Sequence, residues 1–205
     1  MKKTGKRVIP GLNLTMGVTI AMLSIVVLIP LASLAVYSSS LGMKEFFQVI
    51  TRERVLSSFY VSFITAFVAS AVNAVMGLIL AWVLVRYDFP GKRLMDGMIE
   101  LPFALPTAVE GIALTSLTSD QGLVGKFFAQ FGIKIAYTRI GITIALVFIG
   151  IPFVVRAVQP VLEKLDGSYE EAAMVLGAKP AVIFRKVIFP ELMPALFTGT
   201  GLAFG

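Results

Sequence analysis

Three long stretches of this sequence contain no charged residue, and they restrict the folds open to it more than any other feature. They run from Val8 to Met43, from Val55 to Val85 and from Ile140 to Val155. About 20 helical residues span the ~30 Å hydrocarbon core of a bilayer. The first two stretches exceed that length, and the third reaches it if it extends to Val158 while Arg156 reaches the interface. Hydrophobic residues make up 57% of the chain, compared with about 45–50% in soluble domains. The sequence therefore predicts an all-α membrane protein.

We expect one transmembrane domain, residues 1–205, folded as a polytopic helix bundle. The predicted spans are about 12–36, 59–85, 97–117, 140–158 and a partial span at 192–205. The segment from Leu192 to Gly205 is roughly 20 Å long as a helix, which is too short to cross. The chain is therefore expected to be truncated in its fifth span. The first apolar run is too long for a signal peptide of about 7–15 core residues, so we interpret it as a retained span.

The distribution of Lys and Arg predicts the orientation in the membrane. With the N-terminus in the cytoplasm, 12 of the 18 Lys and Arg residues lie on the cytoplasmic side. These include Lys2, Lys3, Lys6 and Arg7. Cytoplasmic loops carry an excess of positive charge. The charge bias therefore predicts a cytoplasmic N-terminus and a cytoplasmic loop at 159–190.

Several kinds of chemistry are excluded by what the sequence lacks. It contains no cysteine and no histidine, so thiolate nucleophiles, Ser-His triads and the usual zinc sites are excluded. No G-x-x-x-x-G-K-[ST] phosphate loop is present, so the chain is not expected to hydrolyse ATP. No basic stripe interleaved with aromatic residues points to nucleic acid. We expect a protein that is not an enzyme, has no cofactor and no metal site, and contacts membrane lipid.

The loop at 159–190 contains the pattern of a short helix built for docking. Ser168 and Glu171 have the spacing of a capping box, and Gly177 is a candidate for the position after the helix, where a positive φ is common. Four apolar residues, Tyr169, Ala172, Ala173 and Leu176, fall at positions i, i+3, i+4 and i+7. The small Ala173 is expected to lie against a partner. Pro190 is expected to prevent a continuous helix into the next span.

This loop resembles the signature of bacterial ABC importer permeases, E-A-A-x3-G-x9-I-x-L-P. Glu171, Ala172, Ala173, Gly177 and Pro190 match it by position, while Val187 and Phe189 replace its Ile and Leu with other apolar residues. The resemblance implies the fold of a type I importer permease. It also implies separate ABC ATPase subunits that dock on the helix at 168–177 and drive alternating access.

The third predicted span contains two prolines four residues apart, Pro102 and Pro106. Pro106 has no N–H to donate to the carbonyl of Pro102, so the helix is expected to break there. A half-helix beginning near Thr107 directs N–H groups and the positive end of its dipole at whatever lies before it, a geometry that suits an anion. A simple packing kink is the alternative. The candidate pathway residues are Pro102, Pro106, Thr107, Glu110 and Gly111.

The broken span and the fourth span resemble the T-type sulfate/thiosulfate permeases. The resembling segments are Phe89–Lys92, Leu101–Val109, Gly150–Arg156 and Val158–Val161. The resemblance implies a second permease subunit, a W-type paralogue, and an extracytoplasmic sulfate/thiosulfate-binding protein. A molybdate/tungstate permease is the alternative within the same class.

Two polar residues lie within predicted spans. Asn73 is expected to form a hydrogen bond between helices. A carboxylate in a membrane span is costly and marks a candidate functional residue, so Glu110 has three interpretations: a structural pairing, a ligand of the pathway, or a proton or cation site of an autonomous channel or secondary transporter. An acid is unfavourable beside an anion, and a small residue is common here in the resembling family.

Overall fold

The computed structural model describes residues 12–40 and 42–205. The basic residues Lys2, Lys3, Lys6 and Arg7, on which part of the orientation argument rests, lie outside this range. The chain divides into two compact units, one up to Ser58 and the other from Phe59 to Gly205. The described residues form helices and turns, without a β-strand, so the prediction of an all-α protein is confirmed.

The first unit contains one long apolar helix and a short amphipathic one. The long helix consists of α1 (Leu12–Leu23), a π-helical turn η1 (Ser24–Leu28) and α2 (Ile29–Ser39). Pro30 does not interrupt it, because it occupies the first turn of α2, where its missing N–H is tolerated. No residue of its most apolar window is buried in the protein. Helix α3 (Met43–Ile50) follows, and the first turn of α4 (Glu53–Arg86) completes the unit.

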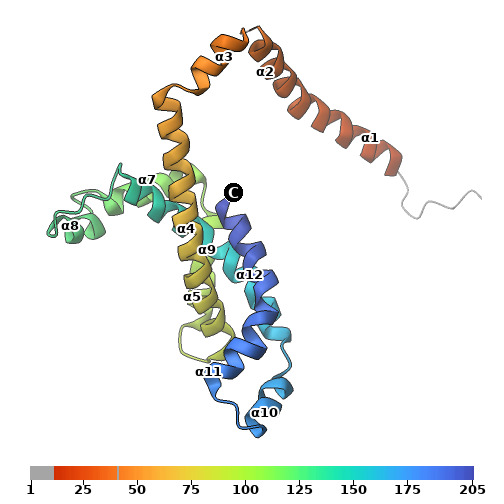
Figure 1. Ribbon diagram of the computed structural model, residues 1–205, viewed down its shortest axis with the longest axis vertical. Helices are drawn as coiled ribbons and strands as arrows, with labels where there is room; N and C mark the ends of the chain where they lie inside the picture. Colours follow the sequence, from red (N-terminus) through yellow and green to blue (C-terminus); the bar gives the residue numbers. More distant parts are fainter. Residues whose placement is uncertain (1–11, 41) are drawn as a thin grey trace, which may run out of the picture. The chain divides into compact units, whose positions relative to one another are not determined.

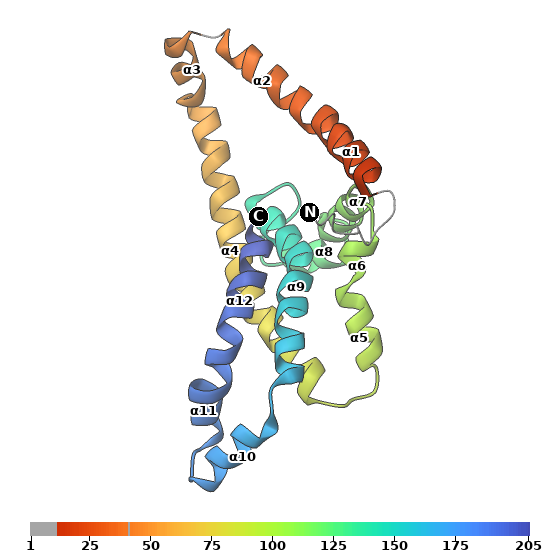
Figure 2. The same cartoon turned by 90° about the vertical axis from the view of Figure 1, so that its right-hand side faces the viewer.

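The second unit is built on the long helices α4, α9 (Arg139–Lys164) and α12 (Phe189–Phe204). Between α4 and α9 the chain forms four short helices, α5 (Lys92–Ile99), α6 (Leu101–Ala104), α7 (Thr107–Thr118) and α8 (Leu123–Ala129). After α9 come α10 (Gly167–Val175), α11 (Pro180–Ile183) and a π-helical turn η2 (Phe184–Ile188). Helices α4, α9 and α12 lie side by side, and α10 and α11 lie at one end of them (Figures 1 and 2).

Small residues allow the three long helices of the second unit to approach closely. Val154 of α9 is fully buried between Gly77 of α4 and Gly199 of α12. A Cβ added to Gly77 would lie 2.6 Å from the Val154 Cβ, and one added to Gly199 would lie 2.8 Å from the Val154 Cα. Small residues at helix contacts are the usual basis of helix packing in membranes, where backbones approach without a hydrophobic driving force.

A buried amide reinforces this packing. Asn73 of α4 is fully buried and donates a hydrogen bond from Nδ2 to the backbone carbonyl of Leu146 in α9, at 3.3 Å. Gly150 makes room for it, because a Cβ there would lie 2.0 Å from the Asn73 Nδ2. The prediction of an interhelical hydrogen bond at Asn73 is confirmed.

Four helical segments in the described residues are long and apolar enough to cross a membrane: Leu14–Ser39, Glu53–Arg86, Arg139–Lys164 and Pro180–Phe204. The region 97–117 is not a continuous helix, since it is divided among α5, α6 and α7. The last segment begins at Pro180 and contains 25 residues, so it is longer than the 192–205 helix expected from the sequence.

The expectation that Pro190 ends the helix is wrong. The helical path continues from α11 through η2 into α12. Phe189 donates its N–H to the carbonyl of Phe184 across five residues, and Pro190 lies in the first turn of α12. The wider π-helical turn accommodates the proline, because a residue in a first helical turn does not need its N–H for the helix itself.

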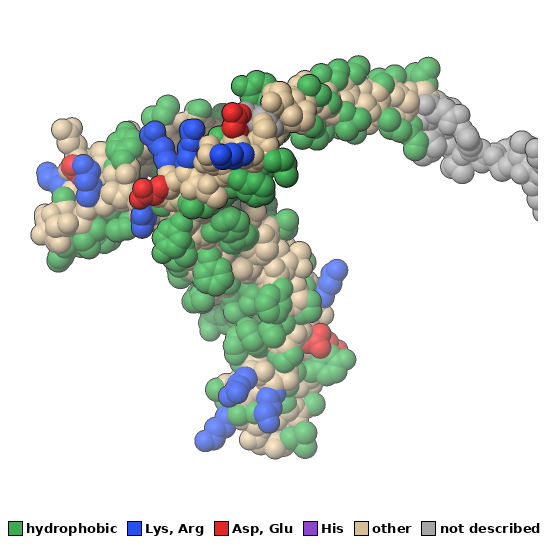
Figure 3. All heavy atoms as spheres, turned by 45° about the horizontal axis from the view of Figure 1, so that its top comes forward, with side chains coloured by type: hydrophobic (Ala, Val, Ile, Leu, Met, Phe, Trp, Pro, Cys, Tyr) green, Lys and Arg blue, Asp and Glu red, His purple; other side chains and the backbone are tan. Residues whose placement is uncertain are grey.

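Hydrophobic side chains cover the middle of the face shown in Figure 3, and Lys and Arg side chains lie both at its lower end and at its upper part, where Asp and Glu side chains are mixed with them. In the second unit the long helices also carry basic residues at their ends: α4 ends at Arg86, and α9 begins at Arg139 and ends at Lys164. An apolar belt between charged ends is the surface expected of helices that cross a bilayer.

Candidate functional site: the loop helix and the broken helix

The N-terminus of the loop helix α10 is capped by Asp166, not by the predicted Ser168. The Asp166 backbone is extended, with φ −70° and ψ 120°, and its carboxylate accepts a 2.9 Å hydrogen bond from the Ser168 N–H. This hydrogen bond lowers the pKa of Asp166 below its ordinary value, because it stabilises the charged carboxylate. Ser168 therefore lies inside the first turn, and the predicted capping box with Glu171 does not form. Asp and Ser are both good N-cap residues. Asp166 is the cap here because its backbone is extended and the helix begins at the next residue, Gly167.

The C-terminus of α10 is closed by Gly177, as the sequence predicts. Gly177 has φ +80°, a conformation that costs most L-residues energy. Its N–H donates to the Met174 carbonyl at 2.9 Å, and the Ala178 N–H donates to the Ala173 carbonyl at 3.0 Å. This pair of hydrogen bonds is a Schellman motif. The motif turns the chain sharply toward α11.

The outer face of α10 is apolar and exposed. Val175 is 88% exposed, Leu176 87% and Tyr169 64%, while Ala172 and Glu171 are also exposed. Ala173 differs from the expectation, because it is partly buried and packs against the core of this same chain. Ala173 therefore lies on the inner side of the helix. The described structure leaves a small apolar surface of Tyr169, Ala172, Val175 and Leu176, which we call the α10 surface.

An ion pair attaches α10 to the end of α4. Arg86, the last residue of α4, donates to the Glu170 carboxylate, and the two side chains are only 28% and 19% exposed. The Arg86 guanidinium also stacks over the Trp82 ring, with 5.1 Å between Cζ and the ring centroid. Sequence reasoning missed Arg86 and Glu170, which are 84 positions apart. In the sequence, Arg86 is only a charged residue at the end of the predicted span 59–85, and Glu170 only one within the predicted loop helix.

A cavity of about 650 Å³ opens beside the start of α10, between the end of α9 and the η2–α12 segment. Its lining is mixed: Lys164 and Lys186 supply positive charge, Asp166 and Glu191 supply negative charge, and Tyr169 forms part of the wall. Because Tyr169 also belongs to the α10 surface, the cavity and that surface are continuous. Together they can receive a protruding polar side chain and its apolar surroundings.

The second candidate region is the break between α6 and α7. Leu105 and Pro106 have extended backbones, with ψ 137° and 135°, and α7 begins at Thr107. The break therefore lies where the proline spacing predicts it. Pro106, Thr107 and Gly111 are exposed in this chain. The first N–H groups of α7 are thus at a surface of the second unit.

Glu110 does not share the exposure of Thr107 and Gly111. It is 3% exposed, and its Oε1 is buried and accepts no hydrogen bond from the residues that the structure describes. Gly111, next to it, lines a cavity of about 230 Å³ between α7 and the start of α9, where Thr115, Thr118 and Thr138 also contribute. The structure therefore separates Glu110 from the exposed N–H groups with which the sequence interpretation grouped it.

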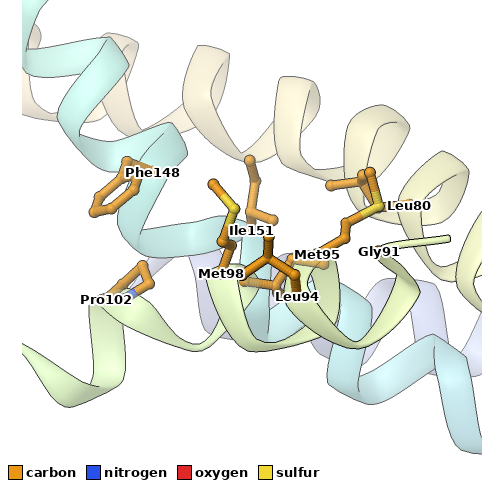
Figure 4. Close-up of a pocket in the computed structure, with 9 residues that line it drawn as sticks. Leu80, Gly91, Leu94, Met95, Met98, Pro102, Phe148 and Ile151 are labelled. Carbon is orange, nitrogen blue, oxygen red and sulfur yellow. The ribbon is translucent and has the colours of Figure 1, made fainter.

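Pro102 faces a different environment from Pro106. It is buried and lines a cavity of about 340 Å³ among α4, α5, α6 and α9, together with residues such as Met98, Phe148 and Ile151 (Figure 4). All nine lining residues are Gly, Pro or large apolar residues. Such a wall offers no side-chain donor or charge to an anion, because recognition of an oxyanion requires hydrogen-bond donors or cations. The cavity beside Pro102 therefore contains no side chain that recognises an anion.

Arg156 connects the same helices at a polar point. Its guanidinium lies 3.1 Å from the Asp96 carboxylate and 2.5 Å from that of Glu100, both on the α5 side. It also donates to the Gln159 side chain at 2.9 Å. The sequence predicts that Arg156 extends to the membrane interface, and in the structure it pairs with two carboxylates. These ion pairs join α5 and Glu100, which follows it, to α9.

Comparison with known proteins identifies the family. The family described as "Binding-protein-dependent transport system inner membrane component" matches residues 73–205. The sulfate transport system permease protein CysT of Salmonella typhimurium is 48% identical over 98% of this chain and 73% of its own length. The Escherichia coli protein of the same name is 46% identical over the same shares. That of Synechocystis is 51% identical over 91% of this chain and 65% of its own length. The chain belongs to the family of inner-membrane components of binding-protein-dependent transport systems.

Proposed function

We propose that this chain is the permease subunit of an ATP-driven importer that moves sulfate, and with it thiosulfate, across the cytoplasmic membrane. The observation that carries the proposal is α10: a capped, nine-residue helix with an exposed apolar surface at the end of the long helices. Its relatives are named sulfate permeases at 46–51% identity. They do not favour the molybdate or tungstate alternative. Family membership argues against an autonomous channel or secondary transporter.

This chain has no phosphate loop of its own, so a separate subunit hydrolyses the ATP. That ATPase subunit docks on the α10 surface. Val175 and Leu176 are the most exposed of its residues, and their burial on docking supplies the apolar contact, at about 25 cal/mol per Å². The mixed cavity beside Tyr169 accepts a charged side chain of the ATPase. Glu171 and Ala172 form the rim of the surface, and Asp166 and Gly177 fix its two ends.

The orientation follows if α10 faces the cytoplasm, where ATP is available. The N-terminus is then cytoplasmic, and the segment 118–139 is outside, where an extracytoplasmic binding protein delivers the anion. A second permease subunit, a W-type paralogue, completes the pathway. The exposed start of α7 at Thr107 faces that pathway, because its unsatisfied N–H groups and dipole favour an anion. Glu110, which is buried and whose Oε1 has no hydrogen-bond partner among the described residues, takes part in a structural pairing with a cation outside the described residues and does not bind the anion.

Paired substitutions test the docking function in the full-length permease. Leu176→Asp places a charge in the docking surface, so co-purification of the ATPase and sulfate uptake should both be lost while membrane insertion continues. Tyr137→Asp is the matched control: Tyr137 is 90% exposed but lies in the segment expected to be outside, so the ATPase should still co-purify. ATPase binding and uptake at parental levels in Leu176→Asp would refute docking at α10.

A labelling experiment tests the orientation independently. Residues 1–205 contain no cysteine. A cysteine introduced at position 179 or at position 120 is therefore the only thiol in this sequence that can react. An impermeant maleimide applied to intact cells should label position 120 and leave position 179 unlabelled until the membrane is opened. Labelling of position 179 from outside would contradict both the orientation and an intracellular ATPase site.

A further inference from the structure

The Arg86–Glu170 ion pair joins the loop helix to the end of α4. Helix α10 is only nine residues long, and non-helical backbone flanks it at Leu165–Asp166 and Leu176–Lys179. Its other attachments are the packing of Ala173 and Ala178 on the core. A short helix between two bends can move helices that are not adjacent to it in the chain through such side-chain contacts. The ion pair is a direct polar contact between α10 and α4.

The environment of the pair strengthens it. Because both side chains are more than two-thirds buried, they are screened less than a surface pair. The Arg86 Nε is buried and has no hydrogen-bond partner among the described residues, so Arg86 depends on Glu170 and on the face of Trp82. Removing either charge leaves the other partly buried and unpaired, which costs more than the pair itself contributes.

A chain of contacts continues from Arg86 into α12. Trp82 lies edge-on to Phe184, with 5.4 Å between ring centroids, and Phe184 contacts Phe189 at 5.9 Å. Phe184 begins the π-helical turn η2, and Phe189 begins α12. Glu170, Arg86, Trp82 and Phe184 thus join three elements: the loop helix, the end of α4 and the start of the last long helix.

We propose that Arg86 is a positioning residue that transmits displacement of α10 to α4 and, through Trp82 and Phe184, to α12. This inference rests on the proposed docking of an ATPase at α10 and adds the route by which its movement enters the membrane helices. Arg86 is not one of the residues of the α10 surface or of the candidate pathway residues. It acts through Glu170 on one side and through Trp82 on the other.

Charge exchange in the complete transporter tests the link. The variants are Arg86→Glu, Glu170→Arg and the double exchange, each in full-length permease assembled with its ATPase subunits. Each single variant should retain the ATPase but lose about tenfold of sulfate uptake, within the range of a coupling contact. The double exchange should restore most of the uptake. The matched control exchanges Asp88 and Lys92, a neighbouring pair at 2.9 Å in which Asp88 is 99% exposed, and uptake should not change.

A spectroscopic measurement separates transmission from a passive structural role. Trp82 is the single tryptophan of this sequence. Permease labelled with 5-fluorotryptophan and assembled with unlabelled partners should show a ¹⁹F signal, assigned by its loss in Trp82→Phe, that shifts when ATP closes the ATPases. The shift should vanish in Glu170→Arg and return in the double exchange.

The possible results divide clearly. Parental uptake in both single variants, or assembled double-exchange protein with no recovery, overturns transmission by this pair. A Trp82 signal that shifts equally in the parent and in Glu170→Arg also overturns it. If Leu176→Asp still binds the ATPase, docking at α10 itself fails, and that result is distinct from failure of the link. Loss of uptake with retained ATPase, together with recovery on exchange, supports the proposal.

Discussion

Replacing Gly199 by alanine tests the packing on which the membrane helices depend. The added Cβ would lie 2.8 Å from the Val154 Cα, 3.0 Å from the Phe153 carbonyl oxygen and 3.0 Å from the Ala157 Cβ. Two of these atoms belong to the backbone of α9, so no side-chain rotation removes the clash. Helices α9 and α12 must separate instead.

The cost follows from two opposing effects. Overpacking of a well-packed core costs about 1–3 kcal/mol, whereas replacing Gly by Ala within a helix gains roughly 0.5–1 kcal/mol. We therefore expect Gly199→Ala to lower the free energy of unfolding by up to about 2.5 kcal/mol, and to leave the protein about 1–3 kcal/mol less stable than a Gly→Ala exchange without the clash. Gly201 is the matched control, because a Cβ there would meet nothing within 4 Å. Gly201→Ala should leave stability unchanged or raise it by the propensity gain.

Unfolding in mixed micelles with increasing SDS, followed by Trp82 fluorescence, measures the two variants against the parent. Trp82 of α4 contacts Phe184 of η2, so its emission changes when the long helices of the second unit come apart. Gly199→Ala with stability equal to that of Gly201→Ala would show that the α9–α12 contact adjusts without cost. The argument from close backbone approach would then be wrong.

Three further predictions concern α10 and the broken helix. Gly177→Val should destabilise the end of α10 and reduce ATPase co-purification, whereas Gly177→Asn should be milder, because Asn tolerates positive φ better than a β-branched residue; equal effects would contradict the Schellman cap. The lowered pKa of Asp166 means that its capping contribution is complete above the ordinary aspartate pKa and is lost as pH falls through the lowered folded value. The protection of the α10 amides, corrected for the pH dependence of intrinsic exchange, should therefore fall at acidic pH in the parent but not in Asp166→Asn, and a parallel fall in both would refute this. Pro106→Ala restores a backbone donor, so sulfate uptake should fall while ATPase co-purification survives; parental uptake in the assembled variant would show that the break is irrelevant to permeation.

The features that the sequence predicts well depend on local backbone chemistry. The start of α7 at Thr107 follows from the missing N–H of Pro106, and the positive φ of Gly177 follows from its place after an apolar helical repeat. The hydrogen bond of Asn73 follows from the cost of a bare amide in a membrane span. The first two depend on rules that hold whatever the rest of the chain does, whereas for Asn73 the sequence predicts only that a partner exists, and the partner, Leu146, lies 73 positions away.

The features that escaped prediction depend on contacts between distant residues. Arg86 and Glu170 meet only when α10 folds back beneath α4. The inward position of Ala173 has the same cause, because a helical repeat identifies an apolar face but not which part of it contacts the same chain. Asp166 and not Ser168 is the N-cap because α9 ends at Lys164 and α10 already begins at Gly167.

The π-helical turn Phe184–Ile188 determines which residues of the last long helix face inward. Ile183 and Ile188 are 5% and 2% exposed, and Leu192 is fully buried. In a regular α-helix, five residues rotate by about 500°, so positions 183 and 188 would point about 140° apart. The wider turn brings both onto one side, and the helix then continues with a shifted phase. Deleting one residue from this turn would restore the regular phase and turn Leu192 and Gly199 away from α9 while the loop helix kept its place. The π-helical turn thus rotates the helix so that the buried residues before it, such as Ile183, and those after it, such as Leu192, both face the protein.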